Sequence, residues 1–410
     1  MSAARNLVRM LDELGRVTDE PGKLTRTFLS PAMQQANALV TRWMRGAGLK
    51  VREDTVGNLI GRLESPNPKA KTLLLGSHLD TVRDAGRFDG PLGVLLPIAA
   101  LAELKRRGVT LPFAVEVLGF SEEEGVRFSS AYLGSKGYIG KLRAEDLRFR
   151  DAKGISVREA LEKFSFGKFS PPKAAHPARE LLGYVEVHIE QGPVLEKARL
   201  AVGVVSAVAG QTRCRVTLRG HAGHAGTTPM TLRRDALAGA AELVLLAESL
   251  ARKTPGLVAT VGTASVSPGA PNVIPGEVVF SLDVRHARDA IRRAALARLK
   301  AETKKICRRR GLANAWEVTQ DNRAVGCSPK LSAALDRSVR AVQRRSLSLV
   351  SGAGHDGVVM STVTPIAMLF VRCRRGLSHH PDEFASPADL AVALRVIVDF
   401  LERAAREGGG

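Results

Sequence analysis

The sequence predicts an α/β protein in which a larger domain, built on a mixed and mainly parallel sheet, is interrupted by a smaller inserted domain. Apolar runs typical of buried strands alternate with helical segments in the first half of the chain and again near its end. Between residues 212 and 326 the order of elements changes. With 410 residues, of which 44% are hydrophobic, the chain is long enough to form more than one buried core.

The larger domain is predicted to contain residues 1–211 and 327–410. Its opening is helical, because apolar residues from Leu7 to Val17 follow helical spacing and Ser30-Pro31 is a typical helix start. Further apolar runs and helical patterns supply the remaining elements. The strands are predicted at residues 73–75, 113–120, 184–189 and 365–371, and the helices at 94–107, 331–344 and 387–403.

Residues 212–326 are predicted to form the inserted domain. Strands are expected at 213–219, 257–266, 277–285 and 313–318, with helices at 233–252 and 287–310. This βαββαβ order is that of a ferredoxin-like arrangement, and a segment of this length is a usual domain size.

The composition argues against several classes of protein. The longest nearly apolar stretch, residues 93–104, is shorter than the roughly 20 residues that a membrane helix needs. Charged residues interrupt the beginning of the chain, which therefore lacks the apolar core of a secretion signal. The four cysteines are too dispersed for a CxxC metal site or a compact disulfide framework. We expect a cytoplasmic protein with reduced thiols and no membrane contact.

The net charge of +20 raises the question of nucleic-acid binding. The basic residues are spread along predicted helices, and only 4% of the residues are aromatic, so surfaces on which bases could stack are scarce. We therefore expect no nucleic-acid partner and interpret the excess as a solvated surface that attracts small anions. A basic nucleic-acid-binding protein that retains the remnant of a metal site is the alternative from a different functional class.

Side chains that can bind metal ions occur in five segments close to the ends of predicted strands. Open α/β sheets bind ligands at the carboxyl ends of their strands, so we expect these side chains to converge. Mixed imidazole and carboxylate ligands suit Mn²⁺ or Zn²⁺, and a shared carboxylate can hold two ions about 3.5 Å apart. The segments contain His78 and Asp80, Asp89, the carboxylates Glu122, Glu123 and Glu124, His188, and the pair His379 and His380.

Eight segments, in order over nearly the whole chain, carry a resemblance to a known family. They are GSHLDTV (76–82), GRFDGPLGV (86–94), FSEEEGVRF (120–128), HIEQGP (188–193), GHAGHAGTTPM (220–230), PNVIPGE (271–277), SGAGHDG (351–357) and LSHHP (377–381). Together they resemble the ureido-group amidohydrolases, which include allantoate amidohydrolase, N-carbamoyl-L-amino-acid hydrolase and β-ureidopropionase. The resemblance implies a catalytic domain of the dinuclear metallopeptidase fold, with the insert acting as a lid and dimerisation domain.

The resemblance also implies the ligands of two divalent ions in each subunit. His78 and His188 bind one ion, Glu124 and His379 bind the other, and Asp89 bridges the two. The ions are expected to be Mn²⁺ or Zn²⁺, although Co²⁺ and Ni²⁺ accept the same ligands.

Two further residues of this region receive roles from the resemblance. Glu123 is implied as the general base, and Asp80 as the residue that orients His78 and raises its basicity. His380 stands where relatives commonly have asparagine, which leaves His380 as the alternative to His379 as the ligand.

Substrate contacts are implied in both domains. His224 in the insert would stabilise the tetrahedral oxyanion, and Asn272 and Arg285 would together hold a substrate carboxylate, for which the planar guanidinium is well suited. Gln191 and His355 match substrate-pocket positions. In related enzymes the groups of the insert reach the active site of the partner subunit, which implies a homodimer.

These residues predict a hydrolase for a ureido acid. A ureido carbon is a poor electrophile because two nitrogens donate into its carbonyl, and two metal ions can supply both a strong nucleophile and a polarised oxygen. Cleavage of the carbamoyl C–N bond would release CO₂ and ammonia. Allantoate is the first candidate substrate, and N-carbamoyl-L-amino acids or N-carbamoyl-β-alanine are the alternatives. A dipeptidase is less favoured, because peptidases of this fold usually have a carboxylate where this chain has His188.

Overall fold

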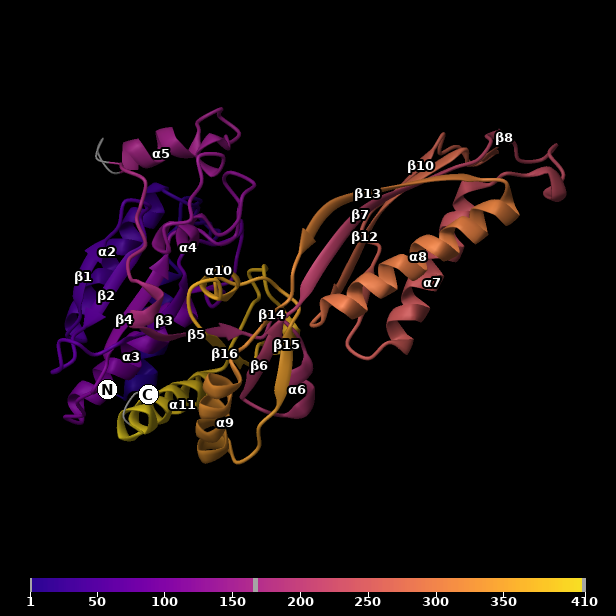
Figure 1. The fold of residues 1–410 in the computed structure, drawn as a ribbon. Helices are drawn as coiled ribbons and strands as arrows, with labels where there is room; N and C mark the ends of the chain where they lie inside the picture. Colours follow the sequence, from indigo (N-terminus) through magenta and orange to yellow (C-terminus); the bar gives the residue numbers. More distant parts are fainter. Residues whose placement is uncertain (1, 165–168, 408–410) are drawn as a thin grey trace. The chain divides into compact units, whose positions relative to one another are not determined.

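The computed structural model describes residues 2–164 and 169–407, which form two compact units (Figure 1). One contains Met1–Ser206 and Cys327–Gly410 and the other contains Ala207–Gly326, and we call them the larger unit and the insert. The insert begins slightly before residue 212. The reason is that β6 (Val202–Val208) is followed almost directly by β7 (Gly210–Arg219), so that one extended segment leads from one sheet into the other.

The larger unit is built on a nine-stranded mixed sheet. Its strand order is β1-β2-β4-β3-β5-β16-β6-β14, and β15 pairs with β6. Besides β6, the strands are Lys50–Glu53 (β1), Leu59–Leu63 (β2), Thr72–His78 (β3), Ala114–Phe120 (β4), Leu181–Ile189 (β5), Val325–Gly326 (β14), Ser348–Ser351 (β15) and Ile366–Val371 (β16).

The four central strands of this sheet are parallel. β3 pairs in parallel with β4 and β5, and β16 pairs in parallel with β5, so the carboxyl ends of all four strands meet at one edge. Every residue of β3, β4 and β16 is buried, as their apolar sequences predict. The outer strands β1, β2 and β6 run antiparallel to their neighbours. The apolar runs in the sequence predict only the central strands. The antiparallel outer strands make the sheet mixed.

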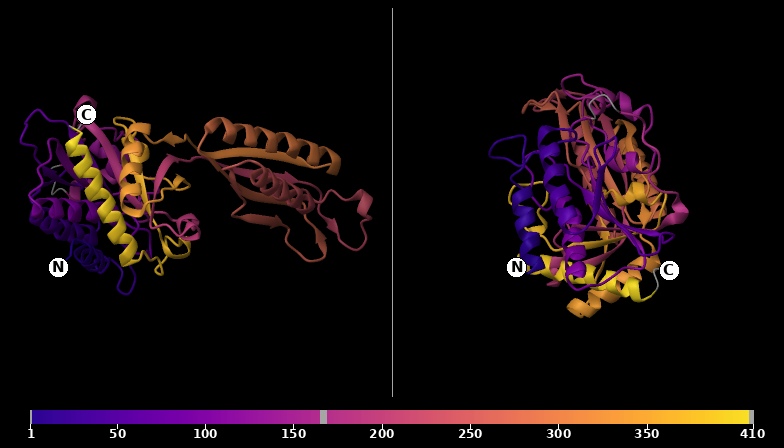
Figure 2. Two further views of the ribbon diagram at one scale, coloured as in Figure 1. Left: turned by 90° about the horizontal axis from the view of Figure 1, so that it is seen from below. Right: turned by 90° about the vertical axis from the view of Figure 1, so that its left-hand side faces the viewer.

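The helices of the larger unit often begin at a Ser-Pro pair. The serine side chain of each pair accepts a backbone N–H of the first turn, at Ser30, Ser328 and Ser386. The proline that follows has no N–H, and none is needed at the first position of a helix. Helices α1 and α11, from the two ends of the chain, lie side by side (Figure 2). The helices are Ala3–Leu14 (α1), Pro31–Gly46 (α2), Pro91–Arg106 (α3), Leu133–Tyr138 (α4), Val157–Phe164 (α5), Val194–Ala198 (α6), Pro329–Gln343 (α9), Gly357–Met360 (α10) and Pro387–Arg406 (α11).

The insert has its own antiparallel sheet, in the order β10-β12-β7-β13, with β9 also paired to β12. Alternate residues of β7 and β12 are buried and pack against α7 and α8, which lie on one side of the sheet (Figure 1). Besides β7, its elements are Gly223–His224 (β8), Val258–Thr260 (β9), Ala264–Ser267 (β10), Val273–Ile274 (β11), Glu277–His286 (β12), Ala313–Asn322 (β13), Ala236–Lys253 (α7) and Asp289–Arg310 (α8).

One predicted strand of the insert is divided in two. The sequence predicts a single strand over residues 257–266, but the structure has β9 and β10 there. β9 pairs with residues 283–285 of β12 and β10 pairs with residues 277–280, so the three residues 261–263 lie opposite only two residues of β12, and this one-residue irregularity interrupts the strand. The prediction of one continuous strand was therefore wrong.

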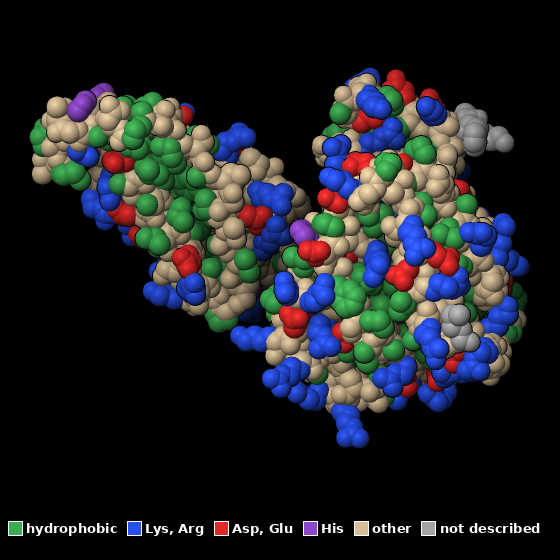
Figure 3. All heavy atoms as spheres, turned by 180° about the vertical axis from the view of Figure 1, so that it is seen from behind, with side chains coloured by type: hydrophobic (Ala, Val, Ile, Leu, Met, Phe, Trp, Pro, Cys, Tyr) green, Lys and Arg blue, Asp and Glu red, His purple; other side chains and the backbone are tan. Residues whose placement is uncertain are grey.

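Basic and acidic side chains are interspersed on the surface of the protein. On the face shown in Figure 3, Lys and Arg side chains are scattered, with Asp and Glu side chains between them. Many of these groups form exposed ion pairs within or between neighbouring helices, as Arg252 does with Glu248. Among residues 2–164 and 169–407, no helix combines the length and the apolar composition that a membrane span requires.

Candidate metal centre

Side chains from the carboxyl edge of the central sheet meet in the larger unit. His78 is the last residue of β3, and His188 lies next to the end of β5. Glu123 and Glu124 follow β4 directly, and the segment with His379 follows β16. The parallel arrangement of these four strands brings together residues that are separated by up to three hundred positions in sequence.

Asp89 lies at the middle of this group. Its Oδ1 atom is 3.1 Å from Nε2 of His188 and 3.5 Å from Nε2 of His78, and its Oδ2 atom is 3.5 Å from Nε2 of His379. His379 Nε2 is also 3.5 Å from Oε1 of Glu124. One carboxylate therefore faces two imidazoles with one oxygen and a third imidazole with the other.

Three overlapping sets of side chains place potential ligand atoms within 4.8 Å of one another. The sets are His78, Asp89 and His188; Asp89, Glu124 and His379; and His78, Glu123 and Glu124. The first two share Asp89 and consist of the residues that the family resemblance implies for the two ions.

The imidazoles are oriented by hydrogen bonds at their other nitrogen. Nδ1 of His78 lies 3.0 Å from the carbonyl oxygen of Asp80 and 3.3 Å from Oδ1 of the same residue. Nδ1 of His188 lies 2.9 Å from the carbonyl oxygen of Ile189. These contacts favour the tautomer with a proton on Nδ1, which leaves the lone pair on Nε2 of each ring, on the side of Asp89, available to a metal ion.

Asp80 also holds the acidic loop. Its Oδ1 accepts the backbone N–H of Glu123 at 3.0 Å, and its Oδ2 accepts that of Glu124 at 3.2 Å. The preceding carboxylate, Glu122, is buried and accepts the N–H of Gly125 and, at 2.9 Å, that of Leu133. Of the three consecutive glutamates, Glu122 therefore supports the loop, while Glu123 and Glu124 belong to the group around His78.

The electrostatics of the group are those of a site that needs positive charge. Burial opposes the ionisation of Asp89, but the imidazoles of His188 and His78 hold its pKa well below the usual range. Burial, and then the charge of Asp89, raises the pKa of Glu124 to about 8. Burial also raises the pKa of Glu123 well above its usual value, and the adjacent Glu124 adds to this rise.

A pair of divalent cations fits these residues. Imidazole nitrogens and carboxylate oxygens are the ligands that Zn²⁺ and Mn²⁺ accept, and two ligand sets that share one carboxylate suit two ions. Bound cations would also compensate the crowded carboxylates whose pKa values are raised.

Gln191 and His355, to which the resemblance gives a role in substrate binding, are in contact with residues of the centre. Gln191 donates from Nε2 to Oδ2 of Asp89 at 2.7 Å, and its Oε1 is buried with no hydrogen-bond partner. His355 is buried with its ring centroid 4.5 Å from that of His188, and its Nε2 lies 2.7 Å from Oγ of Ser351. Burial, together with the neighbouring His188, keeps the pKa of His355 well below the usual range.

The three predicted residues of the insert do not form one group. The exposed His224 pairs through β8 with β11, directly after Asn272, whereas Arg285 lies near the other end of β12. About eight residues of extended strand, or roughly 27 Å, separate Arg285 from the start of β12. Arg285 forms a forked ion pair with Asp283, at 2.9 and 3.0 Å. Within one copy of the insert, the length of β12 therefore keeps Arg285 away from the end of the sheet where Asn272 and His224 lie.

Ser378 and Glu383 belong to the centre but were not predicted. Ser378 donates from Oγ to Oδ2 of Asp89, and Glu383 accepts backbone N–H groups from Phe88 and Asp89. They flank His379 in sequence, which is the one signal that could have found them. The structure also distinguishes the two histidines of this segment, since His380 faces Asp382 and not Asp89.

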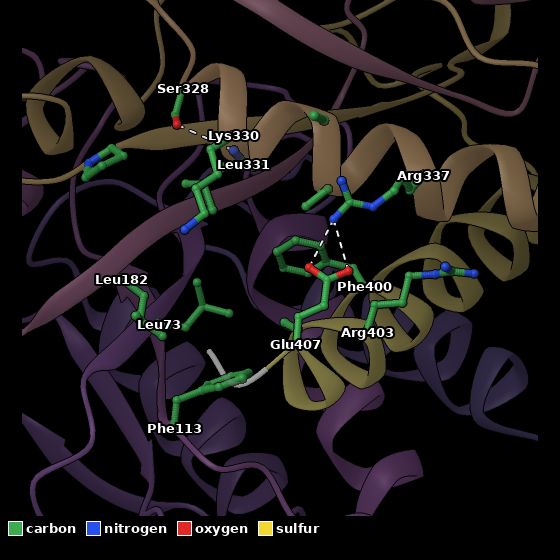
Figure 4. A pocket seen from close by; sticks show the side chains of 14 residues that line it. Leu73, Phe113, Leu182, Ser328, Lys330, Leu331, Arg337, Phe400, Arg403 and Glu407 are labelled. Carbon is green, nitrogen blue, oxygen red and sulfur yellow. Dashed lines mark hydrogen bonds and ion pairs between the residues drawn. The ribbon is translucent and has the colours of Figure 1, made fainter. Parts of the chain in front are cut away.

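A separate apolar pocket lies at the opposite ends of the strands. It has a volume of about 340 Å³ and is lined by Leu73 of β3, Leu182 of β5, Phe113, and residues of α9 and α11 such as Phe400 (Figure 4). Arg337 and Glu407 form an ion pair at its rim. Among the lining residues, Glu407 is the one carboxylate and it is paired with Arg337, so this pocket does not gather a set of metal ligands.

Residues 74–403 match the protein family described as "Peptidase family M20/M25/M40", and this range includes every residue of the centre. The chain belongs to peptidase family M20/M25/M40. This family accounts for the α/β fold with its mixed sheet.

Curated relatives in the M20/M25/M40 family extend over nearly the whole chain. An allantoate deiminase of Arabidopsis thaliana is 42% identical, and the match covers 96% of this chain and 81% of the deiminase. An N-carbamoyl-L-amino acid amidohydrolase of Geobacillus stearothermophilus is 41% identical and covers 97% of both. A solved structure of an amidase of the hydantoinase/carbamoylase family from Burkholderia multivorans has a TM-score of 0.92, with 32% identity and 98% of both chains covered.

Proposed function

We propose that this M20/M25/M40 family member is a metal-dependent amidohydrolase that cleaves the carbamoyl C–N bond of a small ureido acid, with allantoate as the first candidate. The observation that carries the proposal is the pair of ligand sets that share Asp89, in a chain whose relatives include an allantoate deiminase and an N-carbamoyl-amino-acid amidohydrolase. The second candidate substrate is an N-carbamoyl-L-amino acid, which the Geobacillus stearothermophilus relative favours because each chain covers 97% of the other.

The two ions would each have two ligands of their own and share Asp89. His78 and His188 would hold one ion, and Glu124 and His379 would hold the other. Mn²⁺ and Zn²⁺ are the first candidates, and Co²⁺ and Ni²⁺ accept the same ligands. When bound, such ions polarise a carbonyl oxygen and lower the pKa of a water molecule.

Glu123 would move the proton during hydrolysis. Its backbone is held by Asp80, which places its carboxyl group beside His78 and Glu124 without using it as a bridge between the ions. The carboxylate would take the proton of the attacking water and pass it to the departing nitrogen of the ureido group. Breaking this C–N bond leaves carbamic acid, which decomposes to CO₂ and ammonia.

The insert would act as a ferredoxin-like lid and dimerisation domain. Its strand order, with β7 and β12 at the centre and β13 and β10 outside, supports this assignment. His224 would donate a hydrogen bond to the oxyanion, and Asn272 and Arg285 would bind the substrate carboxylate. Because Arg285 lies far along the sheet from His224 and Asn272, a homodimer is proposed in which each active site takes Arg285 from one subunit and His224 from its partner.

Release of ammonia tests the proposed function. The protein is stripped with chelator, loaded with Mn²⁺, Zn²⁺, Co²⁺ or Ni²⁺ in parallel, and incubated separately with allantoate, N-carbamoyl-β-alanine, several N-carbamoyl-L-amino acids and a dipeptide. We expect ammonia from allantoate or from an N-carbamoyl-L-amino acid, and no cleavage of the dipeptide. If the dipeptide alone is hydrolysed, or if no substrate releases ammonia with any of the four metals, the proposal is wrong.

A further inference from the structure

Two segments far apart in sequence are joined beside the metal centre by one buried carboxylate. Oε1 of Glu383 accepts the backbone N–H of Phe88 at 2.8 Å and that of Asp89 at 3.1 Å. Glu383 is only 5% exposed, and its segment also contains His379. The same side chain therefore fixes the main chain that carries Asp89 and belongs to the loop that carries His379.

Ser378 extends this link to the Asp89 side chain. Its Oγ donates to Oδ2 of Asp89 and lies 3.2 Å from Oε2 of Glu383. Nε2 of Gln191 donates to the same Asp89 oxygen. With main chain and Oδ2 both held, the carboxylate keeps Oδ1 toward His188.

The close approach of the two segments depends on a small residue. A Cβ atom at Gly86 would lie 2.3 Å from Cβ of Glu383, so any larger side chain at this position would push the two segments apart. On the other side, the rings of Phe88 and Phe384 pack edge to face with their centroids 6.2 Å apart. The contact is thus packed on both sides of the Glu383 carboxylate.

We propose that Glu383, acting through Ser378 and the backbone of residues 88 and 89, is a positioning residue that directs the Asp89 carboxylate toward both ions. The inference rests on the proposed metal dependence of this chain. Groups that hold a metal ligand in place typically change metal affinity by 10- to 100-fold when they are removed, although they never contact the ion themselves.

The affinity of the protein for Mn²⁺ provides the test and requires no substrate. Chelator-stripped protein is titrated with Mn²⁺ by calorimetry, and the thermal midpoint of the metal-free protein is measured in parallel. We expect Glu383→Ala and Ser378→Ala to weaken Mn²⁺ binding by about 10- to 100-fold. Glu383→Gln should recover most of the affinity of Glu383→Ala, because the amide oxygen can still accept both backbone N–H groups.

Asp151 offers a matched control. Its Oδ1 also accepts two backbone N–H groups, from Lys153 at 2.9 Å and Ile155 at 3.0 Å, but it contacts none of the residues of the centre. Asp151→Ala should lower the thermal midpoint and leave the Mn²⁺ affinity unchanged.

The outcomes separate this inference from the proposed function. If Glu383→Ala and Ser378→Ala bind two Mn²⁺ ions as tightly as the parent, Glu383 has a structural role only and the inference is overturned. If Glu383→Ala does not fold, Ser378→Ala decides, and parental affinity in that variant overturns the inference. A parent protein that binds Mn²⁺ but hydrolyses no ureido acid disproves the proposed substrate class and leaves the affinity test intact.

Discussion

Nε2 of His188 lies 3.1 Å from Oδ1 of Asp89, and Nδ1 of the same ring lies 2.9 Å from the carbonyl oxygen of Ile189. The ring is thus held by its own strand on one side and directed at the shared carboxylate on the other. An imidazole at this position adds no negative charge to a group that already contains Glu123 and Glu124. The resemblance implies that His188 favours a ureido substrate over a peptide, because peptidases of this fold usually have a carboxylate at this position.

Replacing Glu123 should separate metal binding from turnover. Glu123→Gln keeps the size of the side chain and removes the carboxylate that would accept a proton, so we expect both ions to stay bound while kcat falls by about 10²- to 10⁴-fold. Metal content measured by elemental analysis and steady-state ammonia release check this. Turnover at the parental rate would show that another group is the base.

The adjacent histidines form a natural pair of variants. His379 lies 3.5 Å from both Asp89 and Glu124, whereas the nearest carboxylate to His380 is that of Asp382, at 3.9 Å. We expect His379→Ala to reduce the number of tightly bound ions from two to one, and His380→Ala to bind both. Mn²⁺ stoichiometry measured by calorimetry distinguishes them, and the reverse result would identify His380 as the ligand.

Metal ions should stabilise the folded protein. The ligands come from four strands and the loops that follow them, and the unfolded chain cannot bring them together. At a free Mn²⁺ concentration of 100 times Kd, one bound ion should add about 2.7 kcal/mol to the free energy of unfolding. Thermal melts of stripped protein at increasing Mn²⁺ concentration measure the effect. A midpoint that does not move would argue against a metal site in the native state.

Mixing two inactive variants tests the proposed dimer. If each active site combines Arg285 of one subunit with His224 of its partner, a heterodimer of His224→Ala and Arg285→Ala has one intact site. Random mixing after dissociation should then restore roughly one quarter of the parental activity. Each variant alone should remain at its own low rate. Activity that stays at the mean of the two variants would place both residues in the same subunit's site.

A surface ion pair gives a prediction about pH. Glu103 on α3 accepts hydrogen bonds from Arg106 and Arg107, and these bonds lower its pKa from 4.5 to about 2. Because the folded-state pKa is the lower one, the stabilisation is present above pH 4.5 and is lost as the pH falls toward 2. At neutral pH, Glu103→Gln should cost less than about 1 kcal/mol, since these arginines are exposed to solvent. Urea unfolding of both proteins at pH 7 and at pH 3 should show the difference shrinking; a difference that is unchanged or larger at pH 3 contradicts the assignment.

Local patterns in the chain were enough to place the long helices and the central strands, but not the short helices α4, α5, α6 and α10. Apolar runs such as residues 113–120 are typical of strands buried on both faces of a sheet, and a Ser-Pro pair begins a helix through contacts within four residues. Because ligands gather at the carboxyl ends of parallel strands, the convergence of His78, Glu124 and His188 could also be expected.

Contacts between distant segments decided the remaining features. The division of residues 257–266 into β9 and β10 depends on a one-residue irregularity in their pairing with β12, and the separation of Asn272 from Arg285 depends on the length of that same strand. Neighbouring residues such as His379 and His380 have the same chemistry, and only the backbone direction determines which ring faces Asp89. The support from Glu383 spans nearly three hundred residues, so no local pattern encodes it.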